Sequence, residues 1–522
     1  MPQDSSLNAD HDHKKFSGLR SSKVFLAKNG AVATEHPMAS MAAIDVLRAG
    51  GNAVDAAVTA SFCLTVTQPH LSGLGGDFFA LYYDAKSGKV HCLNSSGWAP
   101  SGLTINTIRS EGHTGIPLYG PYSVVVPGYA RGVGSLHERF GMTEFSNLLA
   151  PAIRLTQDGF LMHPGLSRHI HQAISEFPTS AKQIFAPNGQ SLVPGSLLRQ
   201  ERLGRSLKTI SQEGVDAFYD GWISKAIVGE LSKQGLQADP ADFTSFQSEW
   251  CEPLAVTYRD FTVYEIPPNS MGATSLLILK SLENVGLRQF KPNSQQRVEA
   301  TLKVVTDAYS RMWTELGDPR FTKIDINHFL SPKGTHGMPE QGNPTRNADT
   351  TYFAVVDKDG NMLSVIQSLF HYFGSRIFPE ACGFFLNNRA SAFKLNGPNR
   401  LEPRKRPLHT LSALLLDRDG EMRTAIGTSG GEFRPQQHAL FVTNLTDYEM
   451  NLEDALAYPR FLLNPDGRVM VEHGFTDLNS LGRHIEVVEF PGGTGVAQAV
   501  EIFDDTKNAI CDIRGEGLPL GF

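Results

Sequence analysis

The sequence has no excess of positive charge and few cysteines. Its 522 residues carry 47 Lys and Arg against 54 Asp and Glu, a formal net charge of −7, so it lacks the basic field that would attract nucleic acid or an anionic lipid surface. The five cysteines are odd in number, scattered, and never spaced C-x-x-C. This spacing argues against a disulfide framework and against a zinc site, and we expect neither a metal nor another cofactor.

Long apolar runs are also missing. The opening stretch MPQDSSLNADHDHKKF lacks the apolar segment of a secretory signal, and no later run reaches the length of a membrane span. We therefore expect a cytoplasmic protein without a membrane partner, and we assign residues 1–28 to a polar N-terminal tail.

Apolar periodicity predicts a mixed α/β (α+β) protein. Apolar residues at three- and four-residue steps favour helices over residues 38–49, 52–64, 145–157, 197–212, 222–234, 296–316, 436–442 and 452–457. Runs of β-branched and aromatic residues favour strands over residues 23–26, 30–34, 78–83, 254–266, 350–356, 362–367, 383–386, 411–416 and 422–426. Because no linker separates the helix-rich half from the strand-rich half, the pattern indicates one interleaved body.

A coil meets a strand at Thr350. Residues 331–348, SPKGTHGMPEQGNPTRNA, have three prolines, three glycines and no apolar periodicity, which is typical of an exposed, flexible segment. If the bond between Asp349 and Thr350 were cut, Thr350 would carry a free α-amino group beside its own hydroxyl. Such an amine, with a pKa of about 7.7 to 8.0, can act as a general base. A threonine at a loop-to-strand junction is also a common structural feature, so this stretch alone leaves both interpretations open.

Ten motifs in order make the chain resemble the gamma-glutamyltransferase family of N-terminal-nucleophile hydrolases. They are HPMASMAAIDVLRAGGNAVDAA (36–57), SGLGGDFF (72–79), YGPYSVVVPG (119–128), PAIRLTQDGF (151–160), AFYDG (217–221), LGDP (316–319), TTYFAVVDKDGN (350–361), FGS (373–375), KRPL (405–408) and SGG (429–431). The glycines of SGLGGD lack the G-x-G-x-x-G spacing and precede a strand, so they indicate tight backbone packing and not phosphate binding.

The resemblance implies a four-layer α-β-β-α sandwich and a proenzyme that cuts itself between Asp349 and Thr350. The cut would give a large subunit of residues 29–349, preceded by the tail, and a small subunit of residues 350–522, which stay associated. A homo-oligomer of such heterodimers is compatible with this organisation.

The resemblance also implies the catalytic roles. Thr350 would attack an amide carbonyl, Ser368 would orient its hydroxyl, and the backbone N–H groups of Gly430 and Gly431 would form the oxyanion hole. Thr351 is the alternative nucleophile if the cut falls one bond later.

The substrate pocket departs from the family pattern. Where the family's D-x-R-E-x-A-P stretch supplies an arginine for a substrate carboxylate, NSSGWAP places Ser96. Where the family surrounds the substrate ammonium with Asn, Gln and Asp, the register from Thr350 gives Phe370, Arg389 and Ala392.

After KRPL, the pair His409-Thr410 replaces two serines. Arg389, with His409 or His371, could hold the carboxylate of a small amide such as oxamate, since a guanidinium binds carboxylates in bidentate fashion. This pattern indicates the oxamate amidohydrolase and acylase-like branch, acting on a small-molecule amide. Equally, Arg389 could be a structural ion-pair partner and Phe370 a core residue.

Two further functions remain open from the sequence. The chain could be a glutathione hydrolase or gamma-glutamyltransferase, or it could be an uncut, inactive relative that serves as a binding protein.

Overall fold

The computed structural model describes residues 23–332, 348–476, 478 and 482–522. Most of the expected coil at 331–348 and most of the expected tail at 1–28 lie outside these residues. Within the segment assigned to the tail, residues 23–27 form a strand.

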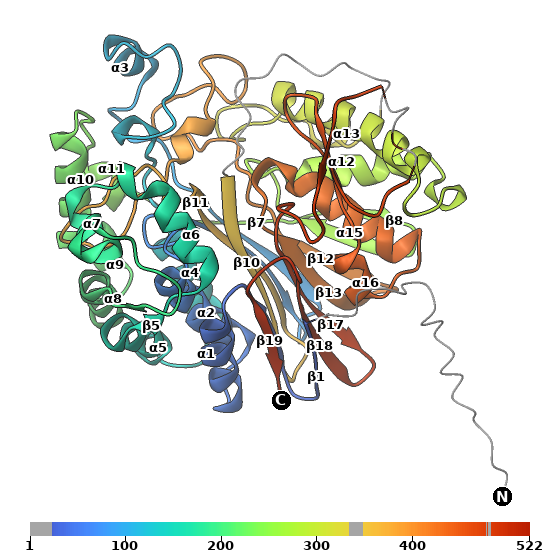
Figure 1. Cartoon of the computed structure of the whole chain (residues 1–522), viewed down its shortest axis with the longest axis horizontal. Coiled ribbons are helices and arrows are strands. Elements are labelled where there is room, and N and C mark those ends of the chain that lie inside the picture. Colours follow the sequence, from blue (N-terminus) through green and yellow to red (C-terminus); the bar gives the residue numbers. More distant parts are fainter. Residues whose placement is uncertain (1–22, 333–347, 477, 479–481) are drawn as a thin grey trace, which may run out of the picture.

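Two seven-stranded sheets occupy the centre of the molecule (Figure 1). Sheet I has the order β1 (Lys23–Ala27), β18 (Thr506–Cys511), β17 (Ala497–Phe503), β13 (Glu421–Thr428), β12 (Leu414–Arg418), β9 (Phe261–Glu265) and β8 (Leu254–Tyr258). Sheet II has the order β19 (Leu518–Gly521), β2 (Ala31–Thr34), β10 (Ala348–Val356), β11 (Met362–His371), β3 (Asp77–Asp84), β4 (Lys89–Ser95) and β7 (Glu249–Cys251). Each sheet contains strands from both sides of Thr350, so the chain is interleaved.

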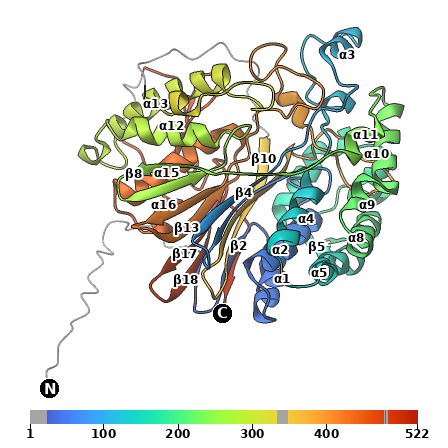
Figure 2. The same ribbon diagram turned by 180° about the vertical axis from the view of Figure 1, so that it is seen from behind.

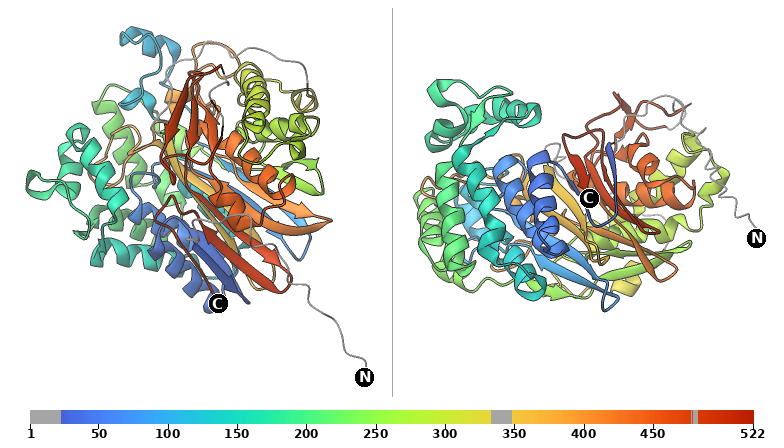
Figure 3. Two further views of the ribbon diagram at one scale, coloured as in Figure 1. Left: turned by 45° about the vertical axis from the view of Figure 1, so that its right-hand side comes forward. Right: turned by 90° about the horizontal axis from the view of Figure 1, so that it is seen from below.

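Helices cover the outer face of each sheet, which gives four layers (Figures 2 and 3). The helices on the sheet II side are α1 (Pro37–Arg48), α2 (Ala53–Thr67), α4 (Tyr129–Phe140), α5 (Phe145–Asp158), α6 (Pro164–Ala173), α7 (Thr179–Phe185), α8 (Glu201–Glu213), α9 (Asp216–Tyr219), α10 (Trp222–Lys233) and α11 (Pro240–Thr244). Those on the sheet I side are α12 (Gly272–Leu282), α13 (Gln295–Glu315), α14 (Ile326–Phe329), α15 (Arg434–Thr446) and α16 (Leu452–Ala457).

Several smaller elements lie outside these layers or between their helices. They include α3 (Ile105–Ser110), the pair β5 (Phe160–Leu161) and β6 (Leu197–Leu198), and a three-stranded sheet of β14 (Phe461–Leu463), β15 (Val469–Glu472) and β16 (Ile485–Val488). Among the described helices, none is both long and apolar enough to cross a membrane.

Strand alternation explains how the layers stack. On β10, Phe353 and Val355 point to the helices beside sheet II, whereas Tyr352, Ala354 and Val356 point into the core between the sheets. Successive side chains of a strand face opposite sides of its sheet. The side chains of β10 therefore pack both in the core beneath the helices and in the core between the two sheets. The four-layer α-β-β-α sandwich is thereby confirmed.

The predicted hairpin at 350–367 is confirmed as the antiparallel pair β10 and β11. Two other predictions were wrong. Residues 197–198 form β6, and α8 begins only at Glu201. Residues 383–386 are no strand, because only Leu386 makes an isolated bridge, with Gly75. Short apolar runs do not separate a strand from a buried loop.

Candidate active site

Thr350 is buried near the start of β10, where the ladder to β11 is irregular. The register shifts between Asp349 and Thr351, and Phe370, which pairs with Asp349, has a φ of +86°. The hydroxyl of Thr350 donates to Ser368 Oγ at 3.3 Å. Ser368 Oγ also accepts from the Phe370 N–H at 2.7 Å. The two hydroxyls therefore lie together at the irregular end of the hairpin.

Tyr352 fixes β10 against sheet I two residues beyond Thr350. A Cβ on Gly427 of β13 would lie 2.3 Å from the Tyr352 ring, so only glycine leaves room for this ring. The Tyr352 hydroxyl bonds Ser364 Oγ at 2.7 Å. Because residues two apart share a face of a strand, Thr350 is directed toward the space between the sheets.

Thr351 follows directly on the same strand, so its side chain points to the opposite face of the sheet. Its hydroxyl is buried and has no hydrogen-bond partner among the described residues. An unsatisfied buried hydroxyl costs about 1 to 3 kcal/mol.

We expect Thr351→Val to keep or raise the melting temperature and to leave activity within twofold of the wild type. Valine has nearly the same shape and removes the unsatisfied hydroxyl. Thermal unfolding and amide hydrolysis of the variant check this result, and a loss of activity would favour Thr351 as the nucleophile.

Gly430 and Gly431 form a turn between β13 and α15. Their φ angles are +119° and +56°, in the region that favours glycine. Neither N–H donates to an acceptor in the part of the chain that the structure describes. The turn contacts β10 and leads into the N-terminus of α15, where the helix dipole favours negative charge.

A buried ion cluster surrounds Arg389, next to Ser368. Asp77 of β3 pairs with Ser368 across the ladder. Asp77 Oδ2 lies 3.0 Å from His409 Nε2 and 3.5 Å from Arg389 Nε. Arg389 Nη1 donates to Thr410 Oγ1 at 3.0 Å. The side chains of Asp77, Arg389 and His409 have no exposed area, so the charge of Arg389 is balanced inside the protein.

Asp77 was not singled out from the sequence, although it lies within SGLGGDFF. The signal was present: Asp77 directly precedes the apolar run of residues 78–83, and a carboxylate that is buried there requires a partner. Tight packing of the same motif is confirmed, because a Cβ on Gly75 would lie 2.2 Å from Phe385 O and one on Gly76 2.4 Å from Ser368 O.

Both ring nitrogens of His409, which the sequence predicts as a carboxylate donor, have partners inside the protein. Its Nδ1 accepts from the Leu411 N–H at 3.1 Å, so its single proton lies on Nε2 and faces Asp77. Burial, and then the charge of Arg389, lower the pKa of His409 to about 3. Burial also lowers the pKa of Arg389 to about 9. The guanidinium is therefore charged at neutral pH, while the imidazole is neutral.

The remaining predicted pocket residues fall into two groups. Phe370 joins the ion cluster, with Arg389 Cζ 4.0 Å from the centre of its ring, and Thr410 belongs to the same cluster. His371 and Ser96 instead bind asparagines: His371 Nδ1 lies 3.0 Å from Asn388 Nδ2, and Ser96 Oγ accepts from Asn269 Nδ2 at 3.1 Å.

No group of three or more His, Cys, Asp and Glu side chains is arranged to hold a metal within the described ranges.

Buried histidines, among them His36, His70, His371 and His409, make the fold sensitive to mild acid, because burial lowers the pKa of each. Burial lowers the pKa values of His36, His371 and His409 to about 3, whereas a histidine of the unfolded chain titrates near 6.5. The unfolded state therefore binds more protons below pH 6.5. Stability is complete above this pH and falls by up to about 1.4 kcal/mol per histidine and pH unit below it.

We expect the melting temperature to fall between pH 6.5 and 5, before most carboxylates titrate. Thermal unfolding at pH 7.5, 6.5 and 5 measures the effect. A melting temperature that stays constant over this range would contradict the expectation.

Comparisons with known proteins agree with this geometry. The family model described as Gamma-glutamyltranspeptidase matches residues 39–522. The chain is 34% identical over 519 residues to the glutathione hydrolase-like YwrD proenzyme of Bacillus subtilis, covering 94% of this chain and 98% of that protein. It is 28% identical over 546 residues to a glutathione hydrolase proenzyme of the same organism, covering 96% of this chain and 92% of that protein.

Solved structures show the same fold. The cephalosporin acylase of Bacillus halodurans superposes with a TM-score of 0.88 at 29% identity, covering 98% of this chain and 99% of that one. The gamma-glutamyltranspeptidase of Helicobacter pylori gives a TM-score of 0.55 at 26% identity, covering 60% of this chain and 90% of that one. The predicted family resemblance is confirmed: the chain belongs to the gamma-glutamyltranspeptidase family and is an amide hydrolase of the N-terminal-nucleophile type.

Proposed function

We propose that this chain is a precursor that cuts its own Asp349–Thr350 bond, and that the freed Thr350 hydrolyses a small amide that carries a carboxylate. One observation carries the proposal: the buried hydroxyl of Thr350 lies 3.3 Å from Ser368 Oγ, at the irregular start of a central strand. Two relatives named proenzymes match nearly the whole chain.

Self-cleavage uses the Thr350 hydroxyl as nucleophile and one water molecule. Thr350 Oγ attacks the carbonyl carbon of Asp349, the C–N bond breaks, and the Thr350 nitrogen takes up the proton. Water then hydrolyses the ester, which leaves a carboxylate on Asp349 and a free amine on Thr350. The positive φ of Phe370, opposite Asp349, stores strain of about 1 to 3 kcal/mol beside the bond that breaks.

Turnover reuses the same hydroxyl. The free amine of Thr350 accepts the proton of its own Oγ, which attacks the amide carbonyl of the substrate. The N–H groups of Gly430 and Gly431 stabilise the oxyanion, and the amine product leaves with the proton. Water hydrolyses the resulting ester and restores Thr350. Ser368 orients the nucleophile throughout.

The hydrogen bonding of Arg389 favours a substrate that carries a carboxylate. Its Nη2 is buried without a hydrogen-bond partner among the described residues, whereas its Nη1 donates to Thr410. A substrate carboxylate would satisfy the free donor in a site of low polarity, where charged hydrogen bonds are strong. Oxamate, whose carboxylate adjoins its amide carbonyl, represents this class.

A γ-glutamyl amide is the second candidate substrate, favoured by relatives that are named glutathione hydrolase or glutathione hydrolase-like. Ser96 at the place of the family's carboxylate clamp argues against it. The cephalosporin acylase, at 29% identity, supports acyl groups other than γ-glutamyl within this fold.

Two measurements test the proposal. Mass spectrometry of the purified protein is expected to show two polypeptides, the second beginning at Thr350, whereas a persistent full-length chain would indicate a binding protein. We expect kcat/KM for oxamate to exceed that for γ-glutamyl-p-nitroanilide and for a glutaryl amide. The reverse order would replace the proposed substrate class by the γ-glutamyl class.

A further inference from the structure

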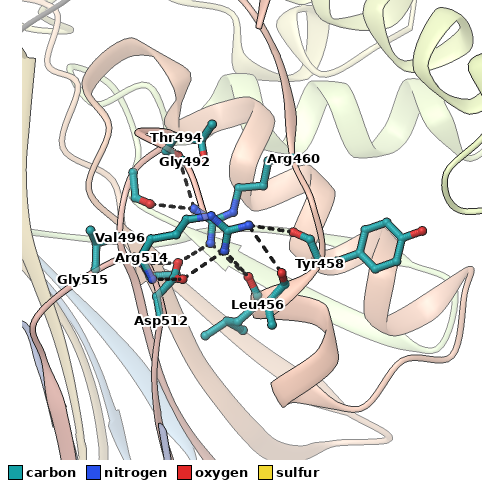
Figure 4. Close-up of polar contacts among 12 residues, drawn as sticks. Leu456, Tyr458, Arg460, Gly492, Thr494, Val496, Asp512, Arg514 and Gly515 are labelled. Carbon is teal, nitrogen blue, oxygen red and sulfur yellow. Dashed lines mark hydrogen bonds and ion pairs between the residues drawn. The ribbon is translucent and has the colours of Figure 1, made fainter. Parts of the chain in front are cut away.

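Two arginines and two acids from the C-terminal part of the sequence form a buried cluster (Figure 4). Arg514 binds Glu472 at 2.5 Å and Asp512 at 3.0 Å, and Arg460 donates to Asp512. The side chains of Arg514, Glu472 and Asp512 have no exposed area, and that of Arg460 is 2% exposed. Because two cations meet two anions, the cluster stays ionised in the protein interior.

Arg460 extends this cluster to the loop of residues 492–496. Its Nη1 donates to the carbonyl oxygens of Thr494 at 3.3 Å and Gly495 at 2.9 Å. Glu472 Oε1 accepts from the Thr494 hydroxyl at 2.7 Å. The cluster therefore fixes both the main chain and a side chain of the loop.

The loop in turn holds Ser429, the residue before Gly430. The Ser429 N–H donates to Val496 O at 2.9 Å, and Ser429 Oγ accepts from the Val496 N–H at 2.9 Å. Gly495 has a φ of +88°, and a Cβ there would lie 2.5 Å from Ser429 O. The loop and Ser429 thus fit together without spare room.

We propose that the cluster of Arg460, Glu472, Asp512 and Arg514 positions the oxyanion donors through the loop of residues 492–496. This inference rests on the proposed role of the Gly430 and Gly431 N–H groups. Their direction depends on the backbone at Ser429, which the loop holds. Since oxyanion donors act on charge that develops in the transition state, the cluster affects kcat and leaves KM nearly unchanged.

Arg460→Lys is the first test. Lysine keeps the positive charge but lacks the planar fork that reaches Asp512 and both loop carbonyls. We expect kcat to fall about 10- to 100-fold, less than the 10²- to 10³-fold loss for removal of a whole oxyanion donor, with KM within twofold. Arg297→Lys is the matched control: Arg297 is equally buried on α13 and donates to Pro292 O and to Asn444, which are not part of the loop of residues 492–496.

Gly495→Ala tests the same step without touching a charge. Its new Cβ would push on Ser429 O, and we expect the same selective loss of kcat. Gly467→Ala is its control, because Gly467 has a similar φ of +84° but nothing within 4 Å of the added Cβ. The two variants share the backbone strain and differ in the contacts of the new Cβ, which on Gly495 would lie 2.5 Å from Ser429 O and 2.5 Å from Gln437 Nε2.

kcat is counted per Thr350 N-terminus, quantified by mass spectrometry, so incomplete cleavage does not lower it. If Arg460→Lys and Gly495→Ala both keep kcat within twofold of the wild type, the cluster only stabilises the fold and the inference is overturned. A wild-type chain that is not cut, or that hydrolyses no amide, would instead refute the proposed function.

Discussion

Thr350→Ala is expected to leave the chain as a single polypeptide and to abolish amide hydrolysis. The substitution removes the only atom proposed to attack both the Asp349 carbonyl and the substrate. Removal of the covalent nucleophile of a hydrolase lowers kcat by about 10⁶-fold. The fold is expected to survive, because alanine fits the space of Thr350 and the core between the sheets rests on Tyr352 and its neighbours.

Electrophoresis and intact-mass measurement after prolonged incubation follow the cleavage, and hydrolysis of the best amide substrate follows activity. Thr351→Val is the matched control, since it removes a neighbouring buried hydroxyl from the same strand and is expected to be cut normally. Thr350→Ser keeps a hydroxyl and is expected to retain slow cleavage. Two polypeptides in Thr350→Ala would refute the assignment of the nucleophile.

Local patterns explain why much of this hairpin could be predicted from the sequence. β10 and β11 are adjacent in the chain, their composition is that of strands, and TTYFAVVDKDGN carries Thr350 within a family motif. Ser368 follows on the returning strand. The geometry of one hairpin therefore brings the two hydroxyls together.

The ion clusters could not be predicted in this way. Arg389 meets Asp77 because Asn387 donates to Gly75 O, which joins the two segments two residues before each side chain. Arg460 meets Asp512 because the chain returns through β17 and β18. No periodicity in the sequence encodes such contacts. The same limit applies to His409: its residue type suits a carboxylate, but the sequence does not show that its Nε2 lies 3.0 Å from Asp77 Oδ2.

The paired substitution Arg389→Met with Asp77→Asn is expected to raise KM for oxamate about 30- to 150-fold while Thr350 is still released. A charged hydrogen bond contributes about 2 to 3 kcal/mol, which corresponds to this ratio. Both charges are removed together because either one alone would be left buried and unpaired. For oxamide, in which a neutral carboxamide replaces the carboxylate, we expect the KM of the paired variant to stay close to that of the wild type. The paired variant then no longer prefers the charged substrate.

The single variant Arg389→Met separates the two roles that the sequence left open for this arginine. It leaves Asp77 without its cation in a site with no exposed area, and breaking a buried pair costs about 3 to 5 kcal/mol. We therefore expect its melting temperature to fall and the paired variant to recover most of the loss. If the paired variant also kept the wild-type KM for oxamate, Arg389 would be only the ion-pair partner of Asp77. A raised KM that persists after stability is restored assigns Arg389 to the substrate carboxylate.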